Sequence, residues 1–233
     1  MITILSVLPE LLNVNGDAEN ARVLAQRARW SGLEAEVVTA AHARPHLVVV
    51  GSGVDATLRE VASALHGMRD DLRGWLADGT ALLAVGTGLE LLSERVQLGD
   101  ADWIEGLSLL PGRAVPADAR VSDDLVVTTR FGRLIGYENH ARNYLLPADA
   151  PALGTVVFGR GNDGRSEGAT SGNAFGTHLT GPVLAKNPAF ADHLLGLVAP
   201  DYSAANDRAR RVDDIAKAAR NLIAARLSVE IEG

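Results

Sequence analysis

The chain has 233 residues, of which 47% are apolar and 22% charged, a composition typical of a globular protein with a substantial core. Its net charge of -7 argues against a nucleic-acid-binding surface, and its apolar runs are too short to cross a bilayer. It contains no cysteine, which excludes disulfides, thiolate metal ligands and cysteine nucleophiles.

Short apolar runs and helical patterns alternate in the first part of the chain. Residues 2–8 alternate as a strand, and they lack the basic segment and cleavage site of a signal peptide, so we predict a cytoplasmic protein. Asp17 is the predicted N-cap of a helix over residues 18–30, which Ser31 and Gly32 end. Further elements are predicted as strands over 34–39, 46–50 and 81–85 and as helices over 56–65 and 70–77. Strands that are apolar throughout favour a parallel sheet covered on both faces.

After about residue 98 the predicted strands become shorter and more polar. They cover residues 107–113, 125–129, 133–137, 154–159 and 174–179. Turns at Pro111-Gly112 and Phe131-Gly132 separate some of them, and we expect these strands to extend the sheet with antiparallel segments.

The tail over residues 207–227 has the pattern of an amphipathic helix. Its apolar positions are Val212, Ile215, Ala219, Leu222 and Ile223, and its basic positions are Arg208, Arg211, Lys217 and Arg220. We predict that the apolar face packs on the body of the protein, with a partner-binding helix as the alternative.

Three glycine-rich turns follow predicted strands, at residues 15–20, 51–55 and 86–88. Ligands of open α/β sheets bind at the carboxyl ends of the strands, where glycines let backbone N–H groups come close. A nucleotide site is a weak interpretation, because neither phosphate-binding glycine pattern is present. The third turn has the strand–turn–helix order of a nucleophile elbow, but its tip is Gly86. Thr87 has no activating base nearby in the sequence, so a purely structural turn is favoured over a threonine nucleophile.

The residues around this turn resemble those of the CobB/CobQ-like class I glutamine amidotransferases. The family's elbow, roughly Leu-Ala-Val-Cys-Gly-Gly-Tyr-Gln-Leu-Leu, is similar to Leu83-Ala84-Val85-Gly86-Thr87-Gly88-Leu89-Glu90-Leu91-Leu92. Four further segments agree in order: residues 16–20 with Gly-Asp-x-x-Asn, 51–55 with Gly-Gly-Gly-Gln-Asp, 136–140 with Gly-(Phe/Tyr)-Glu-Asn-His, and 176–188 with Gly-Thr-Tyr-Leu-His-Gly-Pro-Leu-Leu-x-Lys-Asn-Pro. Within the family, the glutaminase subunits of lipid II isoglutaminyl synthase, the GatD type, look most similar.

The resemblance implies an α/β, flavodoxin-like fold with a mostly parallel sheet flanked by helices and an antiparallel extension. It covers roughly residues 1–200, so we expect one amidotransferase-like domain there. Residues 201–233 are then expected to form a helical tail packed on the same domain.

The resemblance also places the family's catalytic residues on side chains that lack their chemistry. The nucleophilic cysteine falls on Gly86 and the histidine base on Thr180. The elbow glutamine falls on Glu90, and the glutamine of the second turn on Val54. Because nucleophile and base act as a unit, their loss implies that the chain does not hydrolyse glutamine. His178 lies two residues before the base position, about 7 Å from where the base is needed, and is expected to be a packed ring.

Other parts of the family's site are expected to keep their structure in this chain. A vestigial oxyanion pocket is predicted from Gly51, Gly53, Val54, Thr87, Gly88 and Glu90. Arg120 fits an arginine that the resemblance links to activity, and a surface salt bridge is an equally weighted alternative. Glu138, Asn139 and His140 form an intact motif loop that we interpret first as scaffold and second as site lining. We predict no metal site and no cofactor.

Two hypotheses about function follow. In the first, the chain is a non-hydrolysing subunit that docks on a Mur-ligase-like (MurT-type) protein, which in the family complex amidates the D-glutamate of the lipid II stem peptide. In the second, it is a repurposed binding protein with no ligase partner, whose old pocket holds a small amino acid. Glu90 would then favour an ammonium-bearing ligand. A residual hydrolase that uses Thr87 is a minor third hypothesis. None of them involves nucleic acid or membrane insertion.

Overall fold

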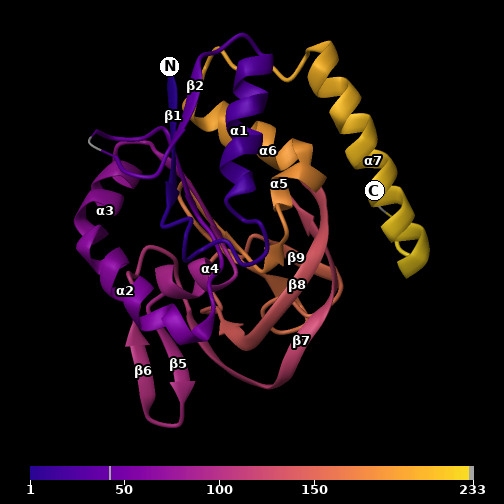
Figure 1. Ribbon diagram of the computed structural model, residues 1–233. Helices are drawn as coiled ribbons and strands as arrows, with labels where there is room; N and C mark the ends of the chain where they lie inside the picture. The colour runs from indigo at the N-terminus through magenta and orange to yellow at the C-terminus, as the bar shows by residue number, and fades with distance from the viewer. Residues whose placement is uncertain (42, 231–233) are drawn as a thin grey trace.

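A six-stranded sheet, sheet A, forms the centre of the molecule in the computed structural model, which describes residues 1–41 and 43–230 (Figure 1). Its strands are β1 (Ile2–Val7), β2 (Ala35–Val38), β3 (Leu47–Val50), β4 (Ala81–Val85), β11 (Ala169–Ser171) and β12 (Ala174–Thr177). They lie in the order β11-β12-β4-β3-β1-β2, and all neighbours are parallel except β11 and β12. This is the flavodoxin-like order, with its switch point between β1 and β3. The predicted fold class is confirmed.

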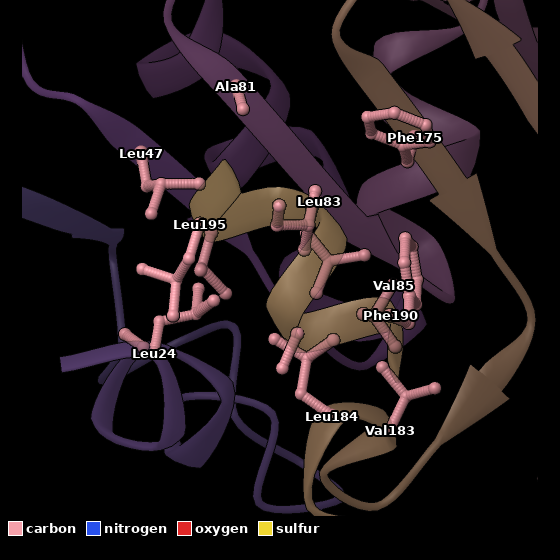
Figure 2. Packing of buried hydrophobic residues seen from close by; sticks show 14 of the residues in the cluster. Leu24, Leu47, Ala81, Leu83, Val85, Phe175, Val183, Leu184, Phe190 and Leu195 are labelled. Carbon is pink, nitrogen blue, oxygen red and sulfur yellow. The ribbon is translucent and has the colours of Figure 1, made fainter. Parts of the chain in front are cut away.

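Helices cover both faces of sheet A. One layer contains α1 (Glu19–Trp30), α5 (Val183–Lys186) and α6 (Pro188–Val198). The other contains α2 (Leu58–Gly67), α3 (Arg69–Ala77) and α4 (Thr87–Leu92), and the 3-10 turn η1 (Asp55–Thr57) precedes α2. Because side chains alternate along a strand, Leu47 and Val49 pack in the first layer and Val48 and Val50 in the second. Figure 2 shows the first layer, where α1 and α6 side chains pack against those of the sheet.

Most of the antiparallel strands form a second sheet, sheet B, rather than extending the first. Its strands are β5 (Arg95–Gly99), β6 (Asp102–Glu105), β7 (Arg113–Thr129), β8 (Gly132–Leu145), β9 (Gly154–Phe158), β10 (Ser166–Glu167) and β13 (Leu179–Thr180). The long strands β7 and β8 pair antiparallel around the turn at Phe131. Strand β13 pairs with β8, Thr180 opposite Tyr137, so sheet B brings two distant motifs together.

Three expectations about local structure were wrong. Residues 107–112 are not a strand, because the backbone N–H groups of residues 107–110 bond to carbonyls at the end of α4 instead of to a strand partner. Residues 174–177 pair parallel to β4 and not antiparallel. Asp17 does not cap α1: the N-cap residue is Ala18, and the Asp17 carboxylate accepts a bond from the backbone N–H of Ser52 at 3.0 Å.

The tail helix α7 (Asp207–Leu227) has the predicted bounds but turns a different face toward the body. Its buried residues are Ala209, Ala216 and Ala224. Of the large apolar residues expected to be buried, Ile223 is partly buried against β7 and β8, whereas Val212, Ile215 and Leu222 are exposed, Ile215 at 70% and Leu222 at 74%. The face toward the protein therefore consists of small alanines together with Ile223, and the predicted docking face of the helix is corrected in part. The division at residue 200 stays a prediction, and residues 231–233 lie outside the described residues.

A buried arginine fixes the rotation of α7. Arg27 of α1 is only 3% exposed, and its guanidinium donates to Asp192 of α6 at 2.8 and 2.9 Å and to Asp213 of α7 at 2.6 Å. One cation thus holds three helices together, and its two carboxylates compensate the cost of its burial.

We expect Arg27→Ala to lower the free energy of unfolding by about 3 kcal/mol, because it leaves two carboxylates without their cation. Urea denaturation followed by circular dichroism measures the change. Arg22→Ala is the control, since Arg22 lies on the same helix in an exposed pair with Glu19 and is expected to cost less than about 1 kcal/mol. Equal losses in the two variants would contradict this account.

Candidate functional site

The turns that follow β1, β3 and β4 meet at the carboxyl edge of sheet A, beside the switch point in strand order. They line a cavity of about 180 Å³, which β8 closes from the other side. Eight of the predicted site residues line it: Gly53, Val54, Gly86, Thr87, Glu90, Arg120, Asn139 and His140. Ser52, Asp55 and Arg142 also line the cavity and were not singled out from the sequence.

Gly86 has a backbone conformation at the tip of the strand–helix turn that glycine adopts readily. Its φ is +56° and its ψ is -119°, a conformation that side-chain-bearing residues rarely adopt. A Cβ atom placed there would lie 3.9 Å from Cγ2 of Thr180, so positions 86 and 180 are neighbours in space. The same Cβ would lie 2.5 Å from Oγ of Ser52. The Ser52 side chain therefore fills the space into which a side chain at position 86 would project.

Two backbone N–H groups at this turn donate hydrogen bonds to side-chain hydroxyl oxygens. The N–H of Thr87 donates to Oγ of Ser52 at 3.3 Å, and the N–H of Gly53 donates to Oγ1 of Thr87 at 2.7 Å. In a nucleophile elbow, the N–H after the nucleophile and a second loop N–H stabilise the oxyanion. In this chain the corresponding groups already have intramolecular acceptors.

The side chains of Thr180 and His178 form hydrogen bonds with groups that do not line the cavity. The hydroxyl of Thr180 donates to the carbonyl of Tyr137 at 3.0 Å. His178 is buried, with Nδ1 3.0 Å from Oε2 of Glu167 and its ring centroid 4.4 Å from that of His140. Burial lowers the pKa of His178, but the charge of Glu167 outweighs it and raises the pKa above its usual value. His178 does not line the cavity.

Glu90 is paired with a buried arginine. Its Oε2 accepts from Nε of Arg142 at 2.8 Å, and the same guanidinium donates to both oxygens of Asp55 at 2.5 and 3.2 Å. Burial raises the pKa of Glu90 despite this partner, whereas the bonds from Arg142 lower the pKa of Asp55. Glu90 lines the cavity and shares the Arg142 cation with Asp55, so the preference for an ammonium-bearing ligand stays a prediction.

Glu138, Asn139 and His140 lie within strand β8 and not in a loop as expected, and hydrogen bonds tie them to their neighbours. The Glu138 carboxylate accepts from the backbone N–H groups of Arg160 at 2.5 Å and Gly161 at 2.8 Å, and it lies 3.0 Å from Nε2 of His140. It thereby holds the turn after β9. Asn139 accepts from Nε of Arg120 at 2.8 Å, which places that guanidinium at the cavity instead of in a surface salt bridge.

Asp17 is a buried carboxylate that bonds to the turn after β3. It is fully buried, accepts from the N–H of Ser52, and has no partner for its second oxygen, Oδ1. Burial raises the pKa of Asp17 to about 6.

Among the described residues, no group of three or more His, Asp or Glu side chains is arranged to hold a metal ion. The same part of the chain has no helix long and apolar enough to span a bilayer.

Residues 3–188 match the family model of the CobB/CobQ-like glutamine amidotransferase domain. The chain belongs to this family. A Staphylococcus aureus (strain N315) relative, the glutamine-hydrolysing lipid II isoglutaminyl synthase subunit GatD, is 29% identical over 204 residues, covering 83% of each chain. The GatD subunit of Streptococcus pneumoniae (strain ATCC BAA-255 / R6) is 25% identical over 200 residues, covering 79% of this chain and 75% of the relative.

Solved structures share the fold at low sequence identity. One glutamine amidotransferase superposes with a TM-score of 0.55 at 18% identity, covering 83% of this chain and 98% of the other. PurLQS from Thermotoga maritima gives 0.53 at 15% identity over 77% and 86% of the two chains. A second amidotransferase, also from Thermotoga maritima, gives 0.53 at 14% identity over 96% and 97%. These similarities support the architecture of the chain alone.

The buried Asp17 predicts a pH dependence of stability with a defined sign. A carboxyl whose pKa is raised on folding, from 3.8 to about 6, contributes stability that is present below pH 4 and lost as the pH rises through 6. We therefore expect the unfolding free energy of the wild type, relative to Asp17→Asn, to fall by about 2–3 kcal/mol between pH 4 and pH 7.

Urea denaturation across this pH range measures the difference, and Asp163→Asn is the control. The pKa of Asp163 is lowered because backbone N–H groups of Arg165 and Ser166 bond to its carboxylate, which outweighs burial. Its stabilisation is present above the unfolded pKa and lost as the pH falls. That loss falls near and below pH 4, so between pH 4 and pH 7 the difference between Asp163→Asn and the wild type should change much less than the difference for Asp17→Asn. An equal change in the two variants would refute the Asp17 assignment.

Proposed function

We propose that this chain is a GatD-like amidotransferase subunit that does not hydrolyse glutamine. The observation that carries the proposal is the elbow itself: Gly86 stands at its tip, and the Ser52 side chain occupies the space where a nucleophile would project. The family reaction requires a thiolate and an imidazole in register, and the chain has no cysteine. The sequence therefore lacks the group that would attack the glutamine amide.

The surroundings of the elbow support the same conclusion. The base position holds Thr180, whose hydroxyl is bonded to Tyr137 and has no basicity at neutral pH. His178 is paired with Glu167 behind the cavity wall and cannot take over the role of base. The hydroxyls of Ser52 and Thr87 compete with any oxyanion for the two backbone N–H groups. Thr87 itself accepts a bond and has no base beside it.

The partner is proposed from the relatives. Both curated relatives are described as subunits of a lipid II isoglutaminyl synthase, so they act in a complex. We propose that this chain docks on a Mur-ligase-like (MurT-type) protein of the cytoplasm that amidates the D-glutamate of lipid II. In such a complex, free ammonia would replace the ammonia that glutamine supplies in the relatives. Co-purification of a tagged chain with such a ligase tests the partnership.

We expect the purified chain, alone or with its ligase, to release no ammonia from glutamine. Glutamate dehydrogenase coupling measures ammonia directly, and a heat-denatured sample supplies the blank. A ligase partner should still amidate its substrate with ammonium chloride but not with glutamine. Turnover of glutamine above the blank would disprove the proposal, whatever the outcome of the co-purification.

Restoring the nucleophile should require space as well as a thiol. In Gly86→Cys/Thr180→His, the new Cβ at position 86 meets Ser52 Oγ at 2.5 Å, so the thiol is expected to be displaced and poorly reactive. Adding Ser52→Gly removes that contact, and we expect labelling by an electrophilic glutamine analogue to become at least about tenfold faster. Intact-mass spectrometry follows the adduct. The matched control is Ser108→Gly in place of Ser52→Gly, since Ser108 does not line the cavity. Equal rates for the two triple variants would show that Ser52 does not block position 86.

A second candidate function is binding of a small amino acid without a ligase. The persistence of a cavity lined by Thr87, Asn139 and Arg120 favours it, since these side chains offer polar contacts to a carboxylate or amide. Calorimetry with glutamine and glutamate tests it. Saturable heat that is lost in Arg120→Ala would support this function, and flat titrations would reject it.

A further inference from the structure

An exposed carboxylate of the chain itself binds the outer edge of a buried guanidinium at the cavity. The Arg142 side chain is 6% exposed, whereas the Asp55 side chain that it binds is 57% exposed. Nη1 and Nη2 of Arg142 donate to the two oxygens of Asp55 at 3.2 and 2.5 Å, and both residues line the cavity. Two N–H···O bonds from one guanidinium to one carboxylate are the geometry in which arginine recognises carboxylate ligands.

Arg142 is held in place by contacts that do not involve Asp55. Its Nε donates to the buried carboxylate of Glu90 at 2.8 Å, and its backbone carbonyl lies 2.6 Å from Nδ1 of His140. Its backbone belongs to β8, where it pairs with Pro116 of β7. If Asp55 moved away, the guanidinium would therefore stay beside Glu90 and leave Nη1 and Nη2 to another acceptor.

Asp55 lies on an exposed turn and is tied to the site by one side chain. Residues 54–56, between β3 and α2, are all exposed. Within the described part of the chain, the Asp55 carboxylate forms hydrogen bonds with Arg142 alone. A carboxylate from solution therefore has a single competitor for these bonds, and displacing it moves an exposed turn and not the core.

The charges around the cavity favour an anion once Asp55 has left. The carboxylate and guanidinium side chains that line the cavity are Asp55, Glu90, Arg120 and Arg142. Without Asp55, two cations therefore face one anion. The bonds from Arg142 and the charge of Arg120 lower the pKa of Asp55, so both cations act on the position that an incoming carboxylate would take.

We infer that Arg142, assisted by the charge of Arg120, forms a binding site for the carboxylate group of a small molecule, and that Asp55 fills this site until such a ligand displaces it. The inference deepens the second candidate function, on which it rests, because it names the group that a ligand must carry and the side chain that must give way. The cavity volume of about 180 Å³ restricts the ligand to a small molecule.

Butyrate and butyramide test the site in NMR titrations of the full-length chain, because they have the same shape and only butyrate carries a carboxylate. We expect butyrate to bind Asp55→Ala at least about tenfold more tightly than the wild type, since this variant lacks the competing carboxylate. Asp55→Asn keeps one acceptor for Arg142 and should bind butyrate with intermediate affinity. Butyramide should bind Asp55→Ala at least about tenfold more weakly than butyrate.

Asp102→Ala is the matched control. Asp102 also pairs with an arginine, Arg59, and its side chain is 53% exposed, but it does not line the cavity. The substitution changes the net charge by the same amount, so butyrate should bind this variant as weakly as the wild type. Asp55→Ala/Arg142→Lys keeps the positive charge and removes the paired N–H groups, and the gain in affinity should be lost.

Circular dichroism and urea midpoints establish which variants are folded, and Asp55→Asn supplies the comparison with the wild type if Asp55→Ala is not. Equal butyrate affinity with and without the Asp55 carboxylate, an equal gain in Asp102→Ala, or equal binding of butyramide would overturn the inference. Tighter binding of inorganic phosphate than of butyrate would overturn the assignment to a carboxylate.

Glutamine and glutamate are titrated separately, into the wild type and Asp55→Ala. Flat titrations with both amino acids would reject the second candidate function, while a gain in butyrate affinity would still establish the carboxylate site. Binding of the amino acids without any effect of Asp55→Ala would keep that function and reject this site. The ammonia assay is independent of all these outcomes.

Discussion

The close approach of the turns after β3 and β4 is the constraint on which the site depends. A Cβ atom at Gly88 would lie 2.6 Å from the carbonyl oxygens of Val50 and Gly51, and one at Gly86 would lie 2.5 Å from Oγ of Ser52. The residues at these positions therefore depend on one another. Ser52 fits in this position because residue 86 has no side chain, and a side chain at residue 86 requires Ser52 to shift. The elbow is retained as backbone geometry, now stabilised by the hydroxyls of Ser52 and Thr87.

The polar residues around the cavity form compensated pairs. A buried charge is costly unless a partner and hydrogen bonds compensate it, and here Glu90 has Arg142, Glu138 has His140 with two backbone N–H groups, and Glu167 has His178. Active sites commonly do the opposite and hold groups that are strained or incompletely bonded until substrate arrives. In this chain the three carboxylates Glu90, Glu138 and Glu167 have such partners, whereas the buried Asp17 keeps one oxygen, Oδ1, without a hydrogen bond.

The sequence predicted the bounds of five strands of sheet A within about two residues, because a parallel sheet covered by helices has strong periodic signals, but it did not predict the short edge strand β11. It also placed Gly86 and Thr180 in one site through the order of the motifs. It did not reveal Ser52 or Arg142, since their roles depend on which side chains meet across turns far apart in the chain. Residues 107–112 were misread because an apolar run satisfies its backbone at the end of α4 as well as it would in a strand.

The tail helix shows most directly why periodicity alone was insufficient. Its pattern locates the large apolar residues on one side, and burial of that side is the usual result. The structure instead buries Ala209, Ala216 and Ala224, which are small enough for α7 to lie close to sheet B while Asp213 reaches Arg27. The ion pair between Asp213 and Arg27 fixes the rotation of the helix, and in this rotation Ile215 and Leu222 lie outside while Ile223 packs partly against β7 and β8. Periodicity therefore identifies the apolar residues of a helix, but a buried ion pair to a residue far away in the sequence decides which of them faces the body.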